Sequence, residues 1–287
     1  MVPANNVDVT AAEASRAADG TAWIEAGSGE PLVLVHGVGM NRAVWAPQIA
    51  YFAERGWRVI AYDMLGHGDS PLPPEQTGLA DLRRQLGALL DELGIERAHL
   101  AGHSMGSLVA IDFALHAPER VYDVVALNAV YERSPAQRSA VQDRARRLAE
   151  GNGEATLEET LDRWFGPEQR ARQPDCIAAV RQLLDAVDPA GYARVYGCFA
   201  CADDAFSGRL PELAVPALFM TGEHDPNSTP EMSSRMAAES PQGELAVVPG
   251  ERHMMAYVEP DSVNPVIERF LRQATGGQGA DVEVQSS

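Results

Sequence analysis

The chain has 287 residues, of which 45% are hydrophobic and 22% are charged, which is enough for one large α/β domain, alone or with an insertion. The net charge of −18 argues against a nucleic-acid-binding surface, because such a surface needs clustered positive charge. All 23 basic residues are Arg, so Walker-type phosphate binding, pyridoxal phosphate attachment and Schiff-base catalysis, which require Lys, are excluded.

Residues 1–20 form an Ala-rich N-terminal segment that ends in the turn signal Asp19-Gly20. Because the stretch TAWIEAG follows, we predict a short antiparallel ribbon at the start of a sheet. Short apolar runs that end in polar or glycine residues then recur at 31–37, 58–64, 98–104, 123–129, 216–222 and 244–250. Such runs are typical of strands covered on both faces.

Helical patterns alternate with these runs, at 44–55, 79–93, 105–116 and 260–273. The alternation predicts an α/β fold with a mostly parallel central sheet flanked by helices. One interval departs from it, because 134–205 is rich in Ala, Leu, Arg and Glu at helical spacing. We therefore predict a helical lid over 133–208, inserted into a core of 21–132 and 209–275, and a flexible polar tail over 276–287.

No stretch approaches the roughly 20 apolar residues of a membrane span, and the N-terminus lacks a basic segment followed by an apolar block. The cysteines, Cys176, Cys198 and Cys201, are too few and too clustered for a disulfide framework. We therefore expect a cytoplasmic protein without a membrane partner. A homodimer is compatible with the sequence and stays open.

The stretch GHSMG places Ser104 between Gly102 and Gly106, at the point where a predicted strand meets a predicted helix. A turn this tight forces backbone conformations that only small side chains tolerate. Strain kept at one residue usually marks a functional site. The pattern G-x-S-x-G is nevertheless weak evidence when it stands alone.

A serine nucleophile needs a base, and the base needs an acid that orients it. GEHDP places Asp225 beyond one predicted strand, and GERH places His253 beyond the next. Adjacent parallel strands would bring both side chains to the sheet edge that carries Ser104. The turn HGVG leaves the amide of Val38 free, and the amide of Met105 lies in the first turn of a helix, so the two could form an oxyanion hole.

From about Thr21 to Leu271 the chain resembles the α/β-hydrolase fold family, through HGVG, DMLGHGDS, GHSMG and the GEHDP…GERH pair in that order. The resemblance implies that Ser104 is the nucleophile, His253 the base and Asp225 its acid, with no metal or cofactor. Some branches carry the acid after the strand that precedes the lid. Asn128 occupies that position here, so Asp225 is preferred.

Other candidate residues have simpler structural interpretations. We expect His67 to be a turn residue and His103 to pack inside the turn around Ser104. Cys198 and Cys201 form a C-x-x-C pair, but no second cysteine pair or matching histidines complete a zinc site. We therefore interpret them as thiols packed on a helix.

Substrate contacts are the least determined part of the site. Arg42 follows the oxyanion turn, and the predicted lid contributes further candidates: Arg163, Trp164, Tyr192, Arg194 and Tyr196. An arginine beside the site could bind a substrate carboxylate with two hydrogen bonds, although a surface salt bridge is an equal alternative for each. The lid and the segment GVGMNRAVW resemble 3-oxoadipate enol-lactonases and amide hydrolases that act on acylaminomethylene succinates.

These expectations describe a serine hydrolase that cleaves an ester, lactone or amide bond of a small, carboxylate-bearing metabolite through an acyl-enzyme. The resemblance suggests aromatic or N-heterocycle catabolism. Ser104 excludes dehalogenase and epoxide hydrolase chemistry, which uses Asp at that position. Two alternatives stay open: a C–C bond hydrolase of ring-cleavage products, which commonly has Asn where this chain has His103, and a small-molecule receptor on a hydrolase scaffold.

Overall fold

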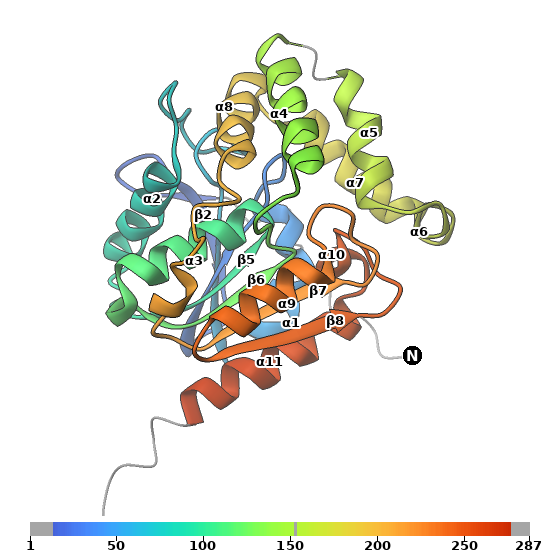
Figure 1. The fold of residues 1–287 in the computed structure, drawn as a ribbon. Coiled ribbons are helices and arrows are strands. Elements are labelled where there is room, and N and C mark those ends of the chain that lie inside the picture. Colours follow the sequence, from blue (N-terminus) through green and yellow to red (C-terminus); the bar gives the residue numbers. More distant parts are fainter. Residues whose placement is uncertain (1–13, 152–153, 277–287) are drawn as a thin grey trace, which may run out of the picture.

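The computed structural model describes residues 14–151 and 154–276, so most of the predicted N-terminal segment and of the predicted tail lies outside the described residues. Within the described residues, one sheet contains eight strands in the order β1-β2-β4-β3-β5-β6-β7-β8 (Figure 1). Their bounds are Ser15–Arg16 (β1), Ala22–Ala26 (β2), Glu30–Val35 (β3), Trp57–Tyr62 (β4), Ala98–His103 (β5), Val121–Leu127 (β6), Ala217–Gly222 (β7) and Gly243–Val248 (β8). From β4 to β8 all neighbouring strands are parallel.

The N-terminal ribbon is antiparallel, as predicted. β1 pairs with β2, and β2 pairs with β4. The connecting turn depends on Gly20, whose φ of +88° favours glycine, and on the Asp19 carboxylate, which accepts a hydrogen bond from the Thr21 amide at 2.8 Å. The sequence signal therefore identified this turn for the correct physical reason.

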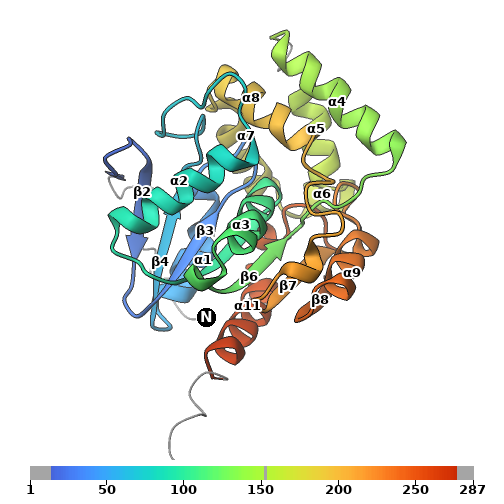
Figure 2. The ribbon, with the colours of Figure 1, turned by 60° about the vertical axis from the view of Figure 1, so that its left-hand side comes forward.

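Helices cover both faces of the sheet (Figures 1 and 2). One apolar cluster joins the sheet to α2, α3 and α9, and the other joins it to α1, α10 and α11. These helices are Ala46–Ala53 (α1), Leu79–Glu92 (α2), Met105–His116 (α3), Pro230–Glu239 (α9), Met255–Val258 (α10) and Pro260–Gly276 (α11), and short 3₁₀ turns occur at Arg42–Trp45, Pro118–Arg120 and Leu210–Glu212. The central strand β5 is buried along its whole length, which explains its continuous apolar sequence.

Between β6 and β7 the chain forms a separate group of helices, which stand above the sheet in Figures 1 and 2. They are Pro135–Ala149 (α4), Glu154–Trp164 (α5), Pro167–Arg172 (α6), Pro174–Asp185 (α7) and Pro189–Ala200 (α8). Ser134 and Gln137 form a capping box at the start of α4, and the Asp188 carboxylate accepts a hydrogen bond from the Gly191 amide at the start of α8. The helical spacing of 134–205 is thus realised in the structure.

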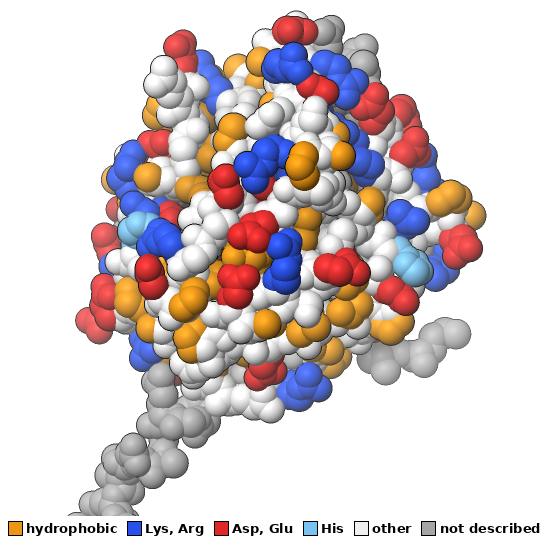
Figure 3. All heavy atoms as spheres, in the orientation of Figure 1, with side chains coloured by type: hydrophobic (Ala, Val, Ile, Leu, Met, Phe, Trp, Pro, Cys, Tyr) orange, Lys and Arg blue, Asp and Glu red, His pale blue; other side chains and the backbone are white. Residues whose placement is uncertain are grey.

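The two ends of this helical insertion meet at a buried carboxylate. Asp203 accepts hydrogen bonds from the Arg133 amide at 2.8 Å and from the Arg138 guanidinium at 2.9 Å. On the face drawn in Figure 3, acidic and arginine side chains are interspersed over the surface. In the part of the chain that the structure describes, no helix is both long enough and apolar enough to cross a bilayer.

Candidate active site

Ser104 lies in a strained turn between β5 and α3. Its φ of +52° and ψ of −113° fall outside the regions that non-glycine residues normally occupy. A Cβ atom on Gly102 would lie 2.2 Å from the Gly106 carbonyl oxygen, and one on Gly106 would lie 2.0 Å from the Val35 carbonyl oxygen. Both glycines are therefore required for α3 to start this close to β5 and β3.

Asp225 and His253 meet at the carboxyl ends of the neighbouring strands β7 and β8. The distance from His253 Nδ1 to Asp225 Oδ2 is 2.7 Å, and both side chains are buried. Burial alone would raise the pKa of Asp225, but the charge of His253 and the hydrogen bonds to the carboxylate hold it below its usual range. In the neutral form of His253, the carboxylate accepts the proton on Nδ1, so the Nε2 lone pair is available as a base; once Nε2 takes a proton, the charge of Asp225 stabilises the imidazolium.

His253 also contacts two neighbouring rings and is held through its backbone. The His103 ring lies 4.9 Å away, and its Nε2 donates to the His253 carbonyl oxygen at 2.8 Å. Burial, together with the nearby His253, lowers the pKa of His103 to about 3, so His103 stays neutral. Trp164 of α5 stacks on His253 with a centroid distance of 5.6 Å. His103 therefore packs inside the turn, as expected, and also contacts the loop that carries His253.

The turn after β3 is tied to the loop after β4 by histidines. His67 Nε2 accepts a hydrogen bond from the Gly39 amide at 2.9 Å, and His36 Nε2 accepts one from the Met64 amide at 2.9 Å. Burial lowers the pKa of His67 to about 3, so it can serve as a neutral acceptor. His67 is thus a turn residue, as the sequence indicated, and it holds the turn that carries Val38.

A small cavity joins Ser104 to His253. Its other lining residues come from the turn after β3, the loop after β7, and helices α5 and α8: Val38, Asn227, Thr160, Arg163, Trp164, Tyr192, Tyr196 and Phe199. The volume of about 30 Å³ accommodates one or two water molecules, whereas metabolite sites usually measure about 300 Å³ or more. Four of the candidate substrate contacts, Arg163, Trp164, Tyr192 and Tyr196, lie here, whereas sequence reasoning missed Thr160, Phe199 and Asn227.

Arg163 lines the cavity, and a second arginine, Arg144, contacts the lining residue Tyr196. Arg163 donates to the Glu159 carbonyl and to the Thr160 hydroxyl, and Arg144 of α4 donates to the Tyr196 hydroxyl at 3.0 Å. Among the described residues, neither Nε atom has a hydrogen-bond acceptor. Burial and the charge of Arg144 lower the pKa of Arg163 to about 10, which still leaves it charged at neutral pH.

The structure does not bring Arg42 to this cavity. Its backbone amide donates to Asp63 Oδ1 at 2.7 Å, and its guanidinium contacts Asp63 and Asp69. Asp63 is fully buried, so its carboxylate needs these donors, and Arg42 is held there. The sequence left two alternatives open for Arg42, a substrate contact and a salt bridge, and in the structure Arg42 forms the salt bridge.

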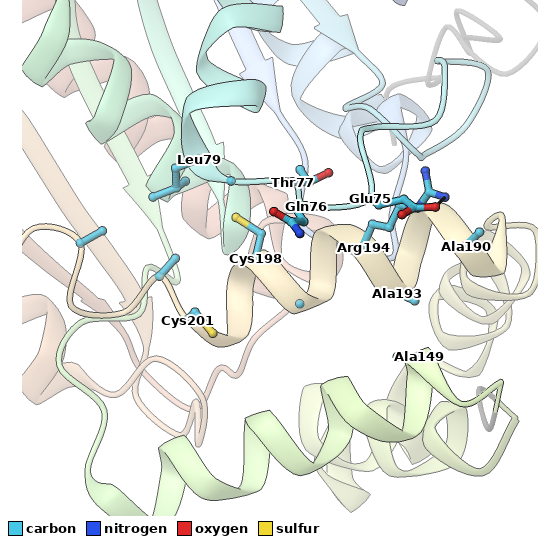
Figure 4. A pocket seen from close by; sticks show the side chains of 14 residues that line it. Glu75, Gln76, Thr77, Leu79, Ala149, Ala190, Ala193, Arg194, Cys198 and Cys201 are labelled. Carbon is cyan, nitrogen blue, oxygen red and sulfur yellow. Dashed lines mark ion pairs between the residues drawn. The ribbon is translucent and has the colours of Figure 1, made fainter.

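Arg194 also lies away from Ser104, because it projects from the opposite side of α8. It donates to the Pro73 carbonyl at 2.6 Å and lines a separate hollow of about 710 Å³ beside residues 75–79 (Figure 4). Cys198 and Cys201 line the same hollow as free thiols. In the described part of the chain, no group of three or more His, Cys, Asp or Glu side chains could hold a metal ion.

Comparison with known proteins agrees with this architecture. A family model for the α/β hydrolase fold matches residues 30–260. The chain is 38% identical over 249 residues to the (E)-2-((N-methylformamido)methylene)succinate hydrolase of Acinetobacter baylyi, covering 87% of this chain and 93% of that protein. It is 29% identical to 3-oxoadipate enol-lactonase 2 of the same organism, covering 84% and 88% of the two chains.

Solved structures with the same fold include a thermophilic esterase from Thermogutta terrifontis, described as malate-bound. It matches with a TM-score of 0.83 and 27% identity, over 92% of this chain and 99% of the esterase. An enol-lactonase from Burkholderia xenovorans matches with a TM-score of 0.81 and 26% identity, over 88% and 97%. These matches and the parallel sheet confirm the expected fold, and the chain belongs to the α/β-hydrolase fold family.

Proposed function

We propose that the protein is a serine hydrolase that cleaves an ester, lactone or amide bond of a small anionic metabolite. The observation that carries the proposal is the buried His253–Asp225 hydrogen bond beside a cavity that also exposes the strained Ser104. Nucleophile, base and orienting acid are the groups that acyl transfer requires. Membership in a family of hydrolases supports the same reaction class.

The reaction would proceed in two acyl-transfer steps. Ser104 Oγ attacks the substrate carbonyl carbon while His253 Nε2 takes the hydroxyl proton, and His253 then gives that proton to the departing oxygen or nitrogen. A water molecule next loses a proton to His253 and adds to the acyl-enzyme. Ser104 recovers the proton as the carboxylic acid leaves. Asp225 stays ionised throughout and stabilises the imidazolium.

The amides of Val38 and Met105 would stabilise the oxyanion. Met105 is the first residue of α3, so its N–H has no acceptor within the helix, and Val38 borders the cavity. No described backbone group accepts a hydrogen bond from either N–H. Preorganised donors of this kind act where negative charge develops in the transition state.

Arg163 and Arg144 support an anionic substrate. Burial and the charge of Arg144 lower the pKa of Arg163, and a substrate carboxylate that binds Arg163 in the cavity would offset the repulsion between these like charges. Two relatives are named for substrates that carry carboxylates, a methylene succinate and an enol-lactone of 3-oxoadipate, and the structural neighbour from Thermogutta terrifontis is described as malate-bound. We therefore assign the carboxylate to Arg163 instead of Arg42, with Arg144 adding positive charge nearby.

The helical insertion 133–208 would act as a lid over the core. The cavity beneath it is too small for a metabolite, so α5 or α8 must move before substrate can enter. The free thiols of Cys176, Cys198 and Cys201 are compatible with a reducing compartment, and we propose a cytoplasmic location.

A labelling and turnover experiment tests this function. A fluorophosphonate probe should modify Ser104 in the wild type and leave Ser104→Ala unlabelled. The wild type should turn over p-nitrophenyl hydrogen succinate many times, and Ser104→Ala should not. Labelling at another residue would refute the assignment. A single covalent turnover would favour a receptor, and a preference for vinylogous diketones over esters would favour C–C bond hydrolysis.

A further inference from the structure

Asn128, the residue that follows β6, has an unusual backbone conformation. Its φ is +52°, in the left-handed region that Asn, Asp and Gly tolerate best, and the residue is completely buried. Its amide donates to the Met220 carbonyl at 2.8 Å, and its carbonyl accepts from the Ser228 hydroxyl at 2.6 Å. The backbone of Asn128 is thus fixed against β7 and against the loop that follows β7.

The Asn128 side chain reaches the carboxylate that binds His253. Its Nδ2 lies 2.9 Å from Asp225 Oδ2, the same oxygen that contacts His253 Nδ1 at 2.7 Å. Nδ2 also lies 3.3 Å from the Thr221 hydroxyl and 3.4 Å from the Arg252 carbonyl. These neighbours are all acceptors, because Thr221 uses its own proton on the Ser228 carbonyl. The amide nitrogen, not the amide oxygen, must therefore face Asp225.

The opposite end of the amide has no such partner. Asn128 Oδ1 is buried and, among the described residues, accepts no hydrogen bond. A buried polar atom without a partner is unfavourable, and a strained backbone adds to the cost. Asn128 keeps the unpaired Oδ1 and the strained backbone although both are unfavourable, and its shortest side-chain hydrogen bond is the one to Asp225. This indicates that Asn128 is present for its hydrogen bond to Asp225.

We propose that Asn128 is a positioning residue that holds the Asp225 carboxylate in the orientation that binds His253. This inference rests on the proposed function. Asn128 donates one proton to Asp225 Oδ2, while the Asn227 amide donates to Oδ1 at 2.8 Å, so the carboxylate is held at both oxygens. Asn128 also contacts the Arg252 carbonyl, next to His253, and thereby ties the acid to the loop that carries the base.

A double-mutant cycle with p-nitrophenyl acetate tests this role. Asn128→Gly removes the side chain and keeps a residue that accepts the left-handed backbone. We expect kcat to fall about 10- to 100-fold with little change in KM, since the lost hydrogen bond goes to a charged group. In an Asp225→Asn background the same substitution should cost no further activity, because Asn128 acts through Asp225.

The pH dependence of Asn128→Asp gives a second, independent test. It decides whether Asn128 positions Asp225 even if Asn128→Gly does not fold. Near pH 8 two carboxylates would repel each other and displace Asp225. As the pH falls toward about 5, the pair should share one proton, and a protonated Asp at this position would again donate to Asp225. The ratio of kcat/KM for this variant to that of the wild type should therefore rise on acidification.

Specific results would overturn the proposal. These are wild-type activity in Asn128→Gly, an equal loss in both backgrounds of the cycle, or a pH-independent ratio for Asn128→Asp. A purely structural role would lower the amount of folded protein and leave KM, kcat per folded molecule and the pH profile unchanged. Failure of the proposed function would look different, because Ser104→Ala and Asp225→Asn would then retain full activity.

Discussion

Replacing Arg163 with Met should weaken the binding of anionic substrates and leave neutral ones nearly unaffected. Arg163 is half-buried in the lining of the cavity, and its Nε–H has no acceptor among the described residues. A charge-assisted hydrogen bond from this group to a substrate carboxylate is worth about 1.5–3 kcal/mol. Because about 1.4 kcal/mol corresponds to a factor of ten, kcat/KM for an anionic ester should fall roughly 10- to 150-fold.

Two esters of similar size measure this effect. We compare p-nitrophenyl hydrogen succinate, which carries a carboxylate, with p-nitrophenyl butyrate, which does not. Arg42→Met and Arg194→Met are matched controls, because these arginines bind Asp63 and Pro73 outside the cavity and should leave the ratio of the two rates unchanged. Equal losses for both esters in Arg163→Met, or a larger loss of selectivity in Arg42→Met, would refute the reasoning.

Three further predictions follow from the same geometry. Ser104→Ala should lower the turnover of p-nitrophenyl acetate about 10⁶-fold without changing the melting temperature, and residual turnover above a thousandth of wild type would contradict its role as the nucleophile. Gly106→Ala should not fold, because its Cβ would lie 2.0 Å from the Val35 carbonyl oxygen. Gly197→Ala on α8 is the control, because its Cβ would meet no atom within 4 Å, and it should raise the melting temperature by about 2 °C. Circular dichroism measures both effects. Because the pKa of Asp225 is lowered in the fold, its charge stabilises the protein above the unfolded value of about 4 and loses this effect as the pH falls through the folded value. The melting temperature of wild type should therefore exceed that of Asp225→Asn near pH 7 and converge with it below about pH 4; a constant difference would argue against the ion pair.

Part of the substrate site could have been predicted more fully from helical periodicity. Tyr192 and Tyr196 are four residues apart on α8 and share the face that lines the cavity. Arg194 lies two residues from each of them and so projects from the other side of the helix, toward Pro73. The spacing of these three residues along the sequence was therefore enough to separate Arg194 from Tyr192 and Tyr196. Arg42 carried no such signal, because its partner Asp63 comes from a different strand end.

The sequence by itself determined the order and type of most elements, because local signals specify them, but α9 at Pro230–Glu239 was not among the predicted helices. The continuous apolar runs mark the parallel strands, although the edge strand β8 leaves Leu245 and Val247 exposed and is not covered on both faces as predicted. The glycines that flank Ser104 permit a turn that no other residues allow.

The order of the strands also predicted that Asp225 and His253 meet at the edge that carries Ser104. Only the tertiary structure decided which further side chains contact them. Asn128 reaches Asp225 across 97 positions of the chain, and Trp164 reaches His253 from a helix inserted elsewhere. Contacts of this kind depend on how strands and helices pack in space, which no local pattern in the chain encodes.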